Sequence, residues 1–191
     1  MEVLSIVYQI QKALQNISVR SFGAKIFLAL LGAYLTALSA KLIIPLPFTP
    51  VPITGQVFVI LLTAYLLGPI YGGLSQLIYV IAGASGLPWY AGGLAGLNTV
   101  ITGGYLIGFI IAAVIIGYLS EQNWFGKSQW RIMIAMLIGL IAIYFLGAMY
   151  LAILMAGDVS SAIKLGVLPF IIPDLLKIFL AANIAYRIKK H

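Results

Sequence analysis

The stretch that decides the fold runs from Trp130 to Ala156 and reads WRIMIAMLIGLIAIYFLGAMYLAILMA. After Arg131 no charged residue occurs until Asp158. A helix needs roughly 20 apolar residues to cross the ~30 Å hydrocarbon core of a bilayer, and this run is long enough. The chain of 191 residues is 63% hydrophobic and 8% charged, with a mean hydropathy of +1.12. One water-facing core cannot hide so much apolar surface, so we expect an all-α bundle embedded in lipid.

Outward from this run, breaks rich in proline and glycine divide the chain into six predicted transmembrane helices. Pro45 to Pro52 cannot continue a helix, Gly68-Pro69 ends a second run, and the segment 85–88 ends a third. The last span is interrupted by Pro169 and Pro173 and reaches residues 187–190. The first five expected spans are 22–44, 54–67, 70–84, 99–119 and 130–156. Residues 21–191 are therefore predicted to form one transmembrane domain.

Residues 1–20 show another pattern, with apolar residues at helical spacing and glutamine, lysine and asparagine between them. The apolar positions are Val3, Ile6, Val7, Ile10, Leu14 and Ile17. This pattern predicts an amphipathic helix in the membrane interface. A short leader helix packed on the bundle explains it equally well.

Lysine and arginine indicate the orientation, because they are enriched on the cytoplasmic side of membrane proteins. With six spans and the N-terminus inside, most of the 11 basic residues fall on the inner side: Lys12, Arg20, Lys25, Lys127, Arg131, Arg187, Lys189 and Lys190. The exceptions are Lys41, Lys164 and Lys177. We therefore expect both termini in the cytoplasm.

This orientation places three irregular segments, 45–52, 89–98 and 158–164, on the outer face. Irregular backbone at membrane depth is buried in protein or lines a cavity. Together the segments predict an outward-facing binding pocket covered by loops that act as lids. Ordinary surface connections remain the alternative for each of them.

Asp174 and Lys177 are the opposite charges that lie deep in a predicted span. Ionisable residues inside a membrane are functional candidates, and the i, i+3 spacing places both on one helix face. The carboxylate can accept N–H bonds from an amide-like ring and the ammonium can donate to a carbonyl, so the pair suits a small polar ligand. A self-neutralising salt bridge and a proton relay are the alternatives.

The outer loops contribute further candidates. Gly92 and Gly93 let the backbone turn sharply, and Trp89 and Tyr90 beside them can form a flat apolar wall or an interfacial anchor. Polar side chains close to the outer face are Gln56, Asn98 and Tyr105.

Small residues repeat every four positions in the first span, at Ala29, Ala33 and Ala37. Such a stripe lets another helix approach closely. Packing inside the bundle and contact with a partner protein explain it equally well.

The sequence lacks the residues that several classes of function require. The chain has no cysteine and one histidine, His191, so a metal site or a thiol nucleophile is not expected. Basic residues do not form a patch with interleaved aromatics, which argues against nucleic acid. No phosphate-binding glycine loop and no Ser-His-Asp set occurs. Energy for any transport must therefore come from a partner ATPase or an ion gradient.

Four short stretches carry a resemblance: VPITGQ (51–56), LGPIYG (67–72), GLPWYAGG (86–93) and TGGYLIGF (102–109). In this order and spacing they resemble the BioY family, the biotin-binding S components of energy-coupling-factor (ECF) transporters. The likeness runs from about Phe22 to the C-terminus. The family's Pro-x-Asp-x-x-Lys pattern is matched in part from Pro173 to Lys177, with the Asp–Lys spacing kept.

The resemblance implies a non-catalytic subunit of a prokaryotic cell membrane that binds biotin and uses no cofactor. It implies that Asp174 and Lys177 hold the biotin head group, with Gln56, the Gly92-Gly93 loop and Tyr105 near the pocket. It also implies a transmembrane coupling (T) protein that docks on the Ala29, Ala33 and Ala37 stripe, and a pair of ABC ATPases.

Three rival functions remain open. An S component for another vitamin needs the same bundle with a different pocket. A small membrane enzyme using Asp174 and Lys177 as acid and base is the second, although polar residues are scarce. A passive channel is disfavoured because no span carries a polar stripe.

Overall fold

The computed structural model describes residues 22–96, 101–122 and 128–190, so the amphipathic helix predicted at 1–20 and the candidate Asn98 lie outside the described residues. The helices are α2 (Phe22–Ser39), α3 (Gln56–Ala84), α4 (Gly103–Glu121), α5 (Gln129–Leu154), α6 (Val159–Gly166) and α7 (Ile171–Lys190). Shorter elements are the strands β1 (Ile43–Ile44) and β2 (Ile53–Thr54) and the 3-10 turns η1 (Ala91–Gly93) and η3 (Leu168–Phe170).

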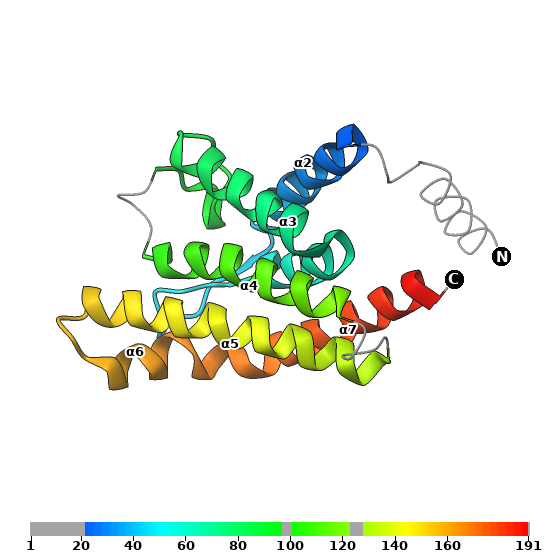
Figure 1. Ribbon diagram of the computed structural model, residues 1–191. Coiled ribbons are helices and arrows are strands. Elements are labelled where there is room, and N and C mark those ends of the chain that lie inside the picture. The colour runs from blue at the N-terminus through cyan, green and yellow to red at the C-terminus, as the bar shows by residue number, and fades with distance from the viewer. Residues whose placement is uncertain (1–21, 97–100, 123–127, 191) are drawn as a thin grey trace.

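The helices pack in sequence order, α2 on α3, α3 on α4 and α4 on α5, while α7 packs on both α3 and α5 (Figure 1). The start of α2, the end of α4 and the end of α7 lie toward one end of the bundle. The turn η1, the start of α4 and the link from α5 to α6 lie toward the other. η1 and the link from α5 to α6, which belong to two of the segments predicted to share the outer face, therefore lie at the end opposite the start of α2 and the end of α7.

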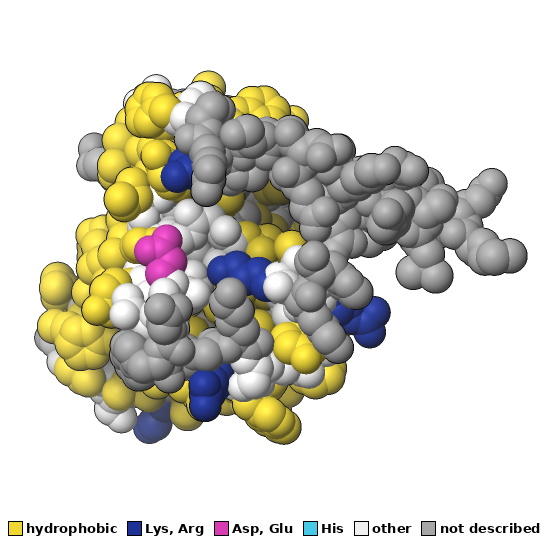
Figure 2. Space-filling model, turned by 45° about the vertical axis from the view of Figure 1, so that its right-hand side comes forward, with side chains coloured by type: hydrophobic (Ala, Val, Ile, Leu, Met, Phe, Trp, Pro, Cys, Tyr) yellow, Lys and Arg dark blue, Asp and Glu magenta, His cyan; other side chains and the backbone are white. Residues whose placement is uncertain are grey.

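The surface is that of a protein in lipid. Large hydrophobic side chains such as Ile172, Ile153 and Phe145 are exposed, whereas the buried core combines many alanines with a smaller set of large apolar and tyrosine side chains. Figure 2 shows apolar side chains over much of the outer surface and charged ones toward the end facing the reader. Within the described residues, five helical segments are long and apolar enough to cross a membrane: Phe22–Ser39, Gln56–Ala84, Gly103–Glu121, Gln129–Leu154 and Val159–Lys189. The chain is a multi-pass membrane protein.

The spans predicted at 54–67 and 70–84 appear as one element, α3, bent at Gly68. Gly68 has φ 77° and ψ −178°, a conformation that residues with a Cβ rarely adopt. A Cβ added at Gly72 would lie 3.0 Å from the Cα of Ala64, eight residues earlier. Eight residues of straight helix would separate them by about 12 Å, so the chain reverses at Gly68 and the two parts of α3 pack on each other.

The first span was predicted to continue to Ile44, but α2 ends at Ser39. The backbone carbonyl of Ser39 accepts a hydrogen bond from Gly55 N, because the chain beyond α2 turns back as a two-stranded ribbon. In that ribbon Ile43 pairs with Thr54 and Ile44 with Ile53, antiparallel. The expectation of an all-α chain is therefore corrected by this short ribbon, whose loop holds the Pro-rich segment.

Candidate ligand-binding site

The ribbon, α3, α4, α5 and α7 line a small cavity of about 50 Å³, which is partly open to the outside. The apolar part of its wall comes from Val51, Pro52, Val57, Ala91, Leu106, Phe109, Ile143 and Phe170. The polar part comes from Thr54, Gln56, Thr102, Tyr105, Tyr144, Asp174 and Lys177. An apolar wall with a few converging polar groups is typical of a site for a small organic ligand.

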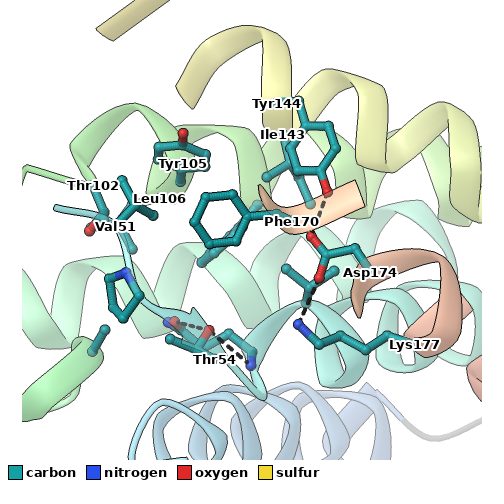
Figure 3. A pocket seen from close by; sticks show the side chains of 15 residues that line it. Val51, Thr54, Thr102, Tyr105, Leu106, Ile143, Tyr144, Phe170, Asp174 and Lys177 are labelled. Atoms are coloured by element: carbon teal, nitrogen blue, oxygen red, sulfur yellow. Dashed lines mark hydrogen bonds and ion pairs between the residues drawn. The ribbon is translucent and has the colours of Figure 1, made fainter. Parts of the chain in front are cut away.

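The carboxylate of Asp174 interacts with two of the other polar groups of this wall. Its side chain is buried, and its Oδ1 pairs with Lys177 Nζ at 2.6 Å. Its Oδ2 accepts a 2.8 Å hydrogen bond from the Tyr144 hydroxyl (Figure 3). Asp174 belongs to the first turn of α7, where the positive end of the helix dipole stabilises a negative charge. The prediction that both charges share one helix face is confirmed, and both line the cavity.

With these two partners, the Asp174 carboxylate can still accept further hydrogen bonds. A carboxylate offers about four lone-pair sites, and the chain's own donors occupy one on each oxygen. The remaining sites suit the N–H groups of a ligand. The Lys177 ammonium keeps two further protons, which can be donated to a ligand carbonyl.

Gln56 lines the cavity from the start of α3. Its Oε1 accepts a 2.8 Å bond from the Thr54 hydroxyl, and its Nε2 donates to the Tyr79 hydroxyl. One amide N–H and one lone pair of Oε1 remain for a ligand.

Tyr105 also lines the cavity, but its hydroxyl is occupied: it donates a 2.7 Å bond to the Gly166 carbonyl at the end of α6. The tyrosine therefore offers its ring to the cavity. In Figure 3 the ring of Phe170 lies in the middle of the view, with Asp174 on one side and Leu106 on the other. A flat apolar group is thus available beside the charge pair.

The structure does not bring the side chains of Trp89 and Tyr90 into the cavity wall, where Ala91 stands instead. Tyr90 is buried against α3, and its hydroxyl donates a 2.6 Å bond to the Val80 carbonyl. Gly92 and Gly93, with φ of 75° and 77°, make the tight turn η1 that places Ala91 at the cavity. These four residues shape the loop behind the pocket.

Ala29, Ala33 and Ala37 are each less than 5% exposed and sit inside the chain's own fold. The surface predicted for a partner is therefore covered here. α2 packs on α3, where a Cβ at Gly32 would overlap Ser75 and where Gln76 Nε2 donates a 3.3 Å bond to Thr36 Oγ1. The small side chains permit this close approach within the chain.

Sequence reasoning missed Tyr144, Thr54 and Phe170 as site residues. A signal for Tyr144 was present, because it lies near the middle of a long apolar helix, whereas tyrosines of membrane helices favour the interfaces. Within the described ranges no group of three or more His, Asp or Glu residues could hold a metal ion.

The fold and the site define a class of protein: a multi-pass membrane protein with a small, mostly apolar cavity that carries a charge pair in its wall. Residues 11–191 match the BioY family. The chain belongs to this family.

Individual relatives agree with that assignment. The "Biotin transporter BioY" of Thermotoga maritima is 42% identical over 153 residues, covering 77% of this chain and 86% of the relative. The "Probable biotin transporter BioY" of Pyrococcus horikoshii is 40% identical over 167 residues, covering 86% and 96%. A crystal structure described as the S-component for biotin from an ECF-type ABC transporter superposes with a TM-score of 0.76 at 28% identity, covering 90% of this chain and 95% of that one.

Proposed function

We propose that this protein is the biotin-binding S component of an ECF-type ABC transporter. The observation that carries the proposal is the buried carboxylate of Asp174, held by Lys177 and Tyr144 in the wall of a mostly apolar cavity. A buried ion pair is often no more stable than apolar residues of the same volume, so its presence calls for a function. The relatives named biotin transporters supply the ligand.

The chemistry of biotin fits this cavity. The ureido ring has two N–H donors and one carbonyl acceptor, so Asp174 accepts from an N–H while Lys177 donates to the carbonyl. The fused sulfur-containing ring is apolar and packs against Phe170 and Leu106. Gln56 contributes its free amide N–H. No cofactor takes part, because binding requires only these side chains.

The loops complete the site in this proposal. The Pro-rich loop of the ribbon and the loop that contains Trp89, Tyr90, Gly92 and Gly93 act as lids over the bound vitamin. Support comes from Val51, Pro52 and Ala91, which these loops contribute to the cavity wall. The Thr49 hydroxyl also ties the ribbon loop to the Leu165 carbonyl of α6, at 2.7 Å.

The topology proposed is six crossings, with the two parts of α3 as the second and third. Both termini are cytoplasmic and the pocket opens outward in a prokaryotic cell membrane. The subunit has no catalytic activity; a transmembrane coupling protein docks on it, and two ABC ATPases hydrolyse the ATP. Docking on α2 occurs close to the Ala29, Ala33 and Ala37 stripe, which becomes accessible to the partner only if α2 shifts on α3.

Isothermal titration of the detergent-purified protein with biotin tests the ligand. We expect one-to-one binding without nucleotide, and none with thiamine or riboflavin as controls. If the folded protein binds another vitamin and does not bind biotin, the ligand assignment is overturned and the family assignment still holds.

The absence of cysteine makes the topology directly testable. Ser85→Cys and Ser128→Cys each create a single thiol at an exposed position. Ser85 follows the end of α3 and Ser128 precedes the start of α5, and these two helix ends lie at opposite ends of the bundle. A membrane-impermeant maleimide added to intact cells should label the first and spare the second. Labelling in the reverse pattern would invert the proposed orientation.

A further inference from the structure

A buried polar chain leads from the cavity to the outer loop through Tyr79, a residue that no sequence motif had singled out. Tyr79 lies in the second part of α3 and is fully buried. The reversal at Gly68 brings it to Gln56, in the first part of the same element. Its hydroxyl accepts from Gln56 Nε2 and donates to the backbone carbonyl of Trp89 at 3.3 Å.

The direction of these bonds is fixed by chemistry. An amide nitrogen only donates and a carbonyl oxygen only accepts, so the Tyr79 proton is committed to Trp89 once Gln56 donates to the hydroxyl oxygen. At the cavity end, the Thr54 hydroxyl donates to Gln56 Oε1, and the opposite amide orientation would take the single Tyr79 proton away from the Trp89 carbonyl. The hydrogen bonds therefore form a continuous series from Thr54 through Gln56 and Tyr79 to the Trp89 carbonyl.

The loop at the far end of this chain is clamped in other ways as well. The Trp89 ring stacks on the Tyr79 ring, with centroids 6.5 Å apart and 16° between the planes. The Tyr90 ring fills the space that a side chain at position 83 would need, and Gly96 N donates to the Gly83 carbonyl at 2.8 Å. Two residues beyond Trp89, Ala91 forms part of the cavity wall. A shift of the Trp89 carbonyl would therefore move that wall.

We propose that the Tyr79 hydroxyl is a positioning group that couples occupancy of the cavity to the placement of the outer loop 85–96. This inference rests on the proposed function, since biotin is the ligand that engages Gln56. A ligand bonded to the Gln56 amide prevents it from rotating, which keeps the bond to Tyr79 and holds the loop over the cavity. Without the hydroxyl, the amide is free to rotate and the loop loses a tie to the pocket.

Tyr79→Phe tests the coupling, because it removes the hydroxyl and keeps the ring that stacks on Trp89. We expect biotin to dissociate about three- to tenfold faster, the loss typical of one or two buried hydrogen bonds, measured as release of labelled biotin into an excess of unlabelled biotin. Tyr34→Phe is the matched control: its ring also contacts the Trp89 ring, and it is half exposed. Its dissociation rate should equal that of the wild type.

A second readout separates coupling from a merely structural role. The chain has three tryptophans, so Trp124→Phe with Trp130→Phe leaves Trp89 as the sole tryptophan, whose emission can be excited apart from that of the tyrosines. Because Trp89 does not line the cavity, a biotin-dependent change in its emission reports movement of the loop. We expect that change in this background and its loss when Tyr79→Phe is added, even at saturating biotin.

The outcomes are distinct. Absence of biotin binding by the wild type would overturn the proposed function and this inference together. Normal binding with an unchanged dissociation rate in Tyr79→Phe would overturn the inference alone. Should that variant fail to fold, a Trp89 emission that does not respond to bound biotin in the parent background would overturn it as well.

Discussion

The Tyr144 hydroxyl of α5 donates a 2.8 Å hydrogen bond to Asp174 Oδ2 at the start of α7. The bond joins two helices across the cavity and orients the carboxylate from the side opposite to Lys177. Two of the chain's own donors thus hold Asp174 before any ligand arrives. Binding then adds contacts to a group already in place, which lowers the entropy lost on association.

Asp174→Asn should weaken biotin binding about tenfold to a hundredfold, because a hydrogen bond to a charged acceptor is lost and the new amide N–H groups face the ligand's own donors. Titration calorimetry measures the change. Glu121→Gln, the same change at the end of α4 and outside the cavity wall, should bind as the wild type does. Unchanged affinity in a folded Asp174→Asn variant would remove Asp174 from the site.

Tyr144→Phe should weaken biotin binding about three- to tenfold, since it deletes one donor to the carboxylate and retains the ring. Tyr118→Phe, at an exposed position of α4, is the matched control and should leave affinity unchanged. Both are measured by the same titration. Equal affinities for the two variants would show that the bond to Asp174 does not matter for binding.

Lys177→Met should destabilise the ligand-free protein by about 3 kcal/mol, because it leaves the buried Asp174 carboxylate without its cation. Thermal unfolding in detergent reports the loss. Adding Asp174→Asn to this variant removes the unpaired charge, so the double variant should unfold at a higher temperature than Lys177→Met alone. Strictly additive losses would contradict an energetic coupling between the two side chains.

Gly117→Ala should destabilise the fold by about 1–3 kcal/mol, because the new Cβ would overlap the backbone of Gly68 and Pro69 at the reversal of α3. Gly23→Ala offers a comparison in open space near the start of α2, where alanine favours helix and costs nothing sterically. Thermal unfolding of both variants checks the difference. A Gly117→Ala protein as stable as Gly23→Ala would mean that α3 and α4 do not pack as described.

Asp158 caps α6 by accepting a 2.9 Å hydrogen bond from Ser161 N. The hydrogen bonds from Ser161 lower the pKa of the Asp158 carboxyl below its usual 3.8. The folded state thus favours the charged form, so the stabilisation is present above about pH 4 and is lost as the pH falls through the lowered pKa. The melting temperature of the wild type relative to Asp158→Asn should therefore fall between about pH 6 and about pH 3. A constant difference would exclude a contribution from this cap.

Local patterns carried most of the correct predictions. The apolar runs and their proline and glycine breaks located the helices, because the length needed to cross a bilayer and the chemistry of these two residues act within a few positions. The Asp174–Lys177 pair was likewise predictable, since three residues of helix bring two side chains to one face.

The rest depended on contacts distant in sequence. Tyr144 reaches Asp174 from another helix, and no spacing within either helix reveals that contact. Trp89 and Tyr90 stand beside Ala91 in sequence, yet their side chains turn toward α3 while Ala91 faces the cavity. The same small residues suit an internal contact or a partner, so periodicity alone could not tell that α3 covers Ala29, Ala33 and Ala37.

The reversal at Gly68 also bears on biosynthesis. At 1.5 Å per residue, 56–67 extends about 18 Å and 69–84 about 24 Å, and neither matches a hydrocarbon core of about 30 Å. On the proposed topology the two parts must enter the bilayer together, as a hairpin with Gly68-Pro69 at its tip. A substitution that straightened this turn would merge two crossings into one. Every helix made afterwards would then face the opposite way, and the newly synthesised protein would present its vitamin pocket to the cytoplasm.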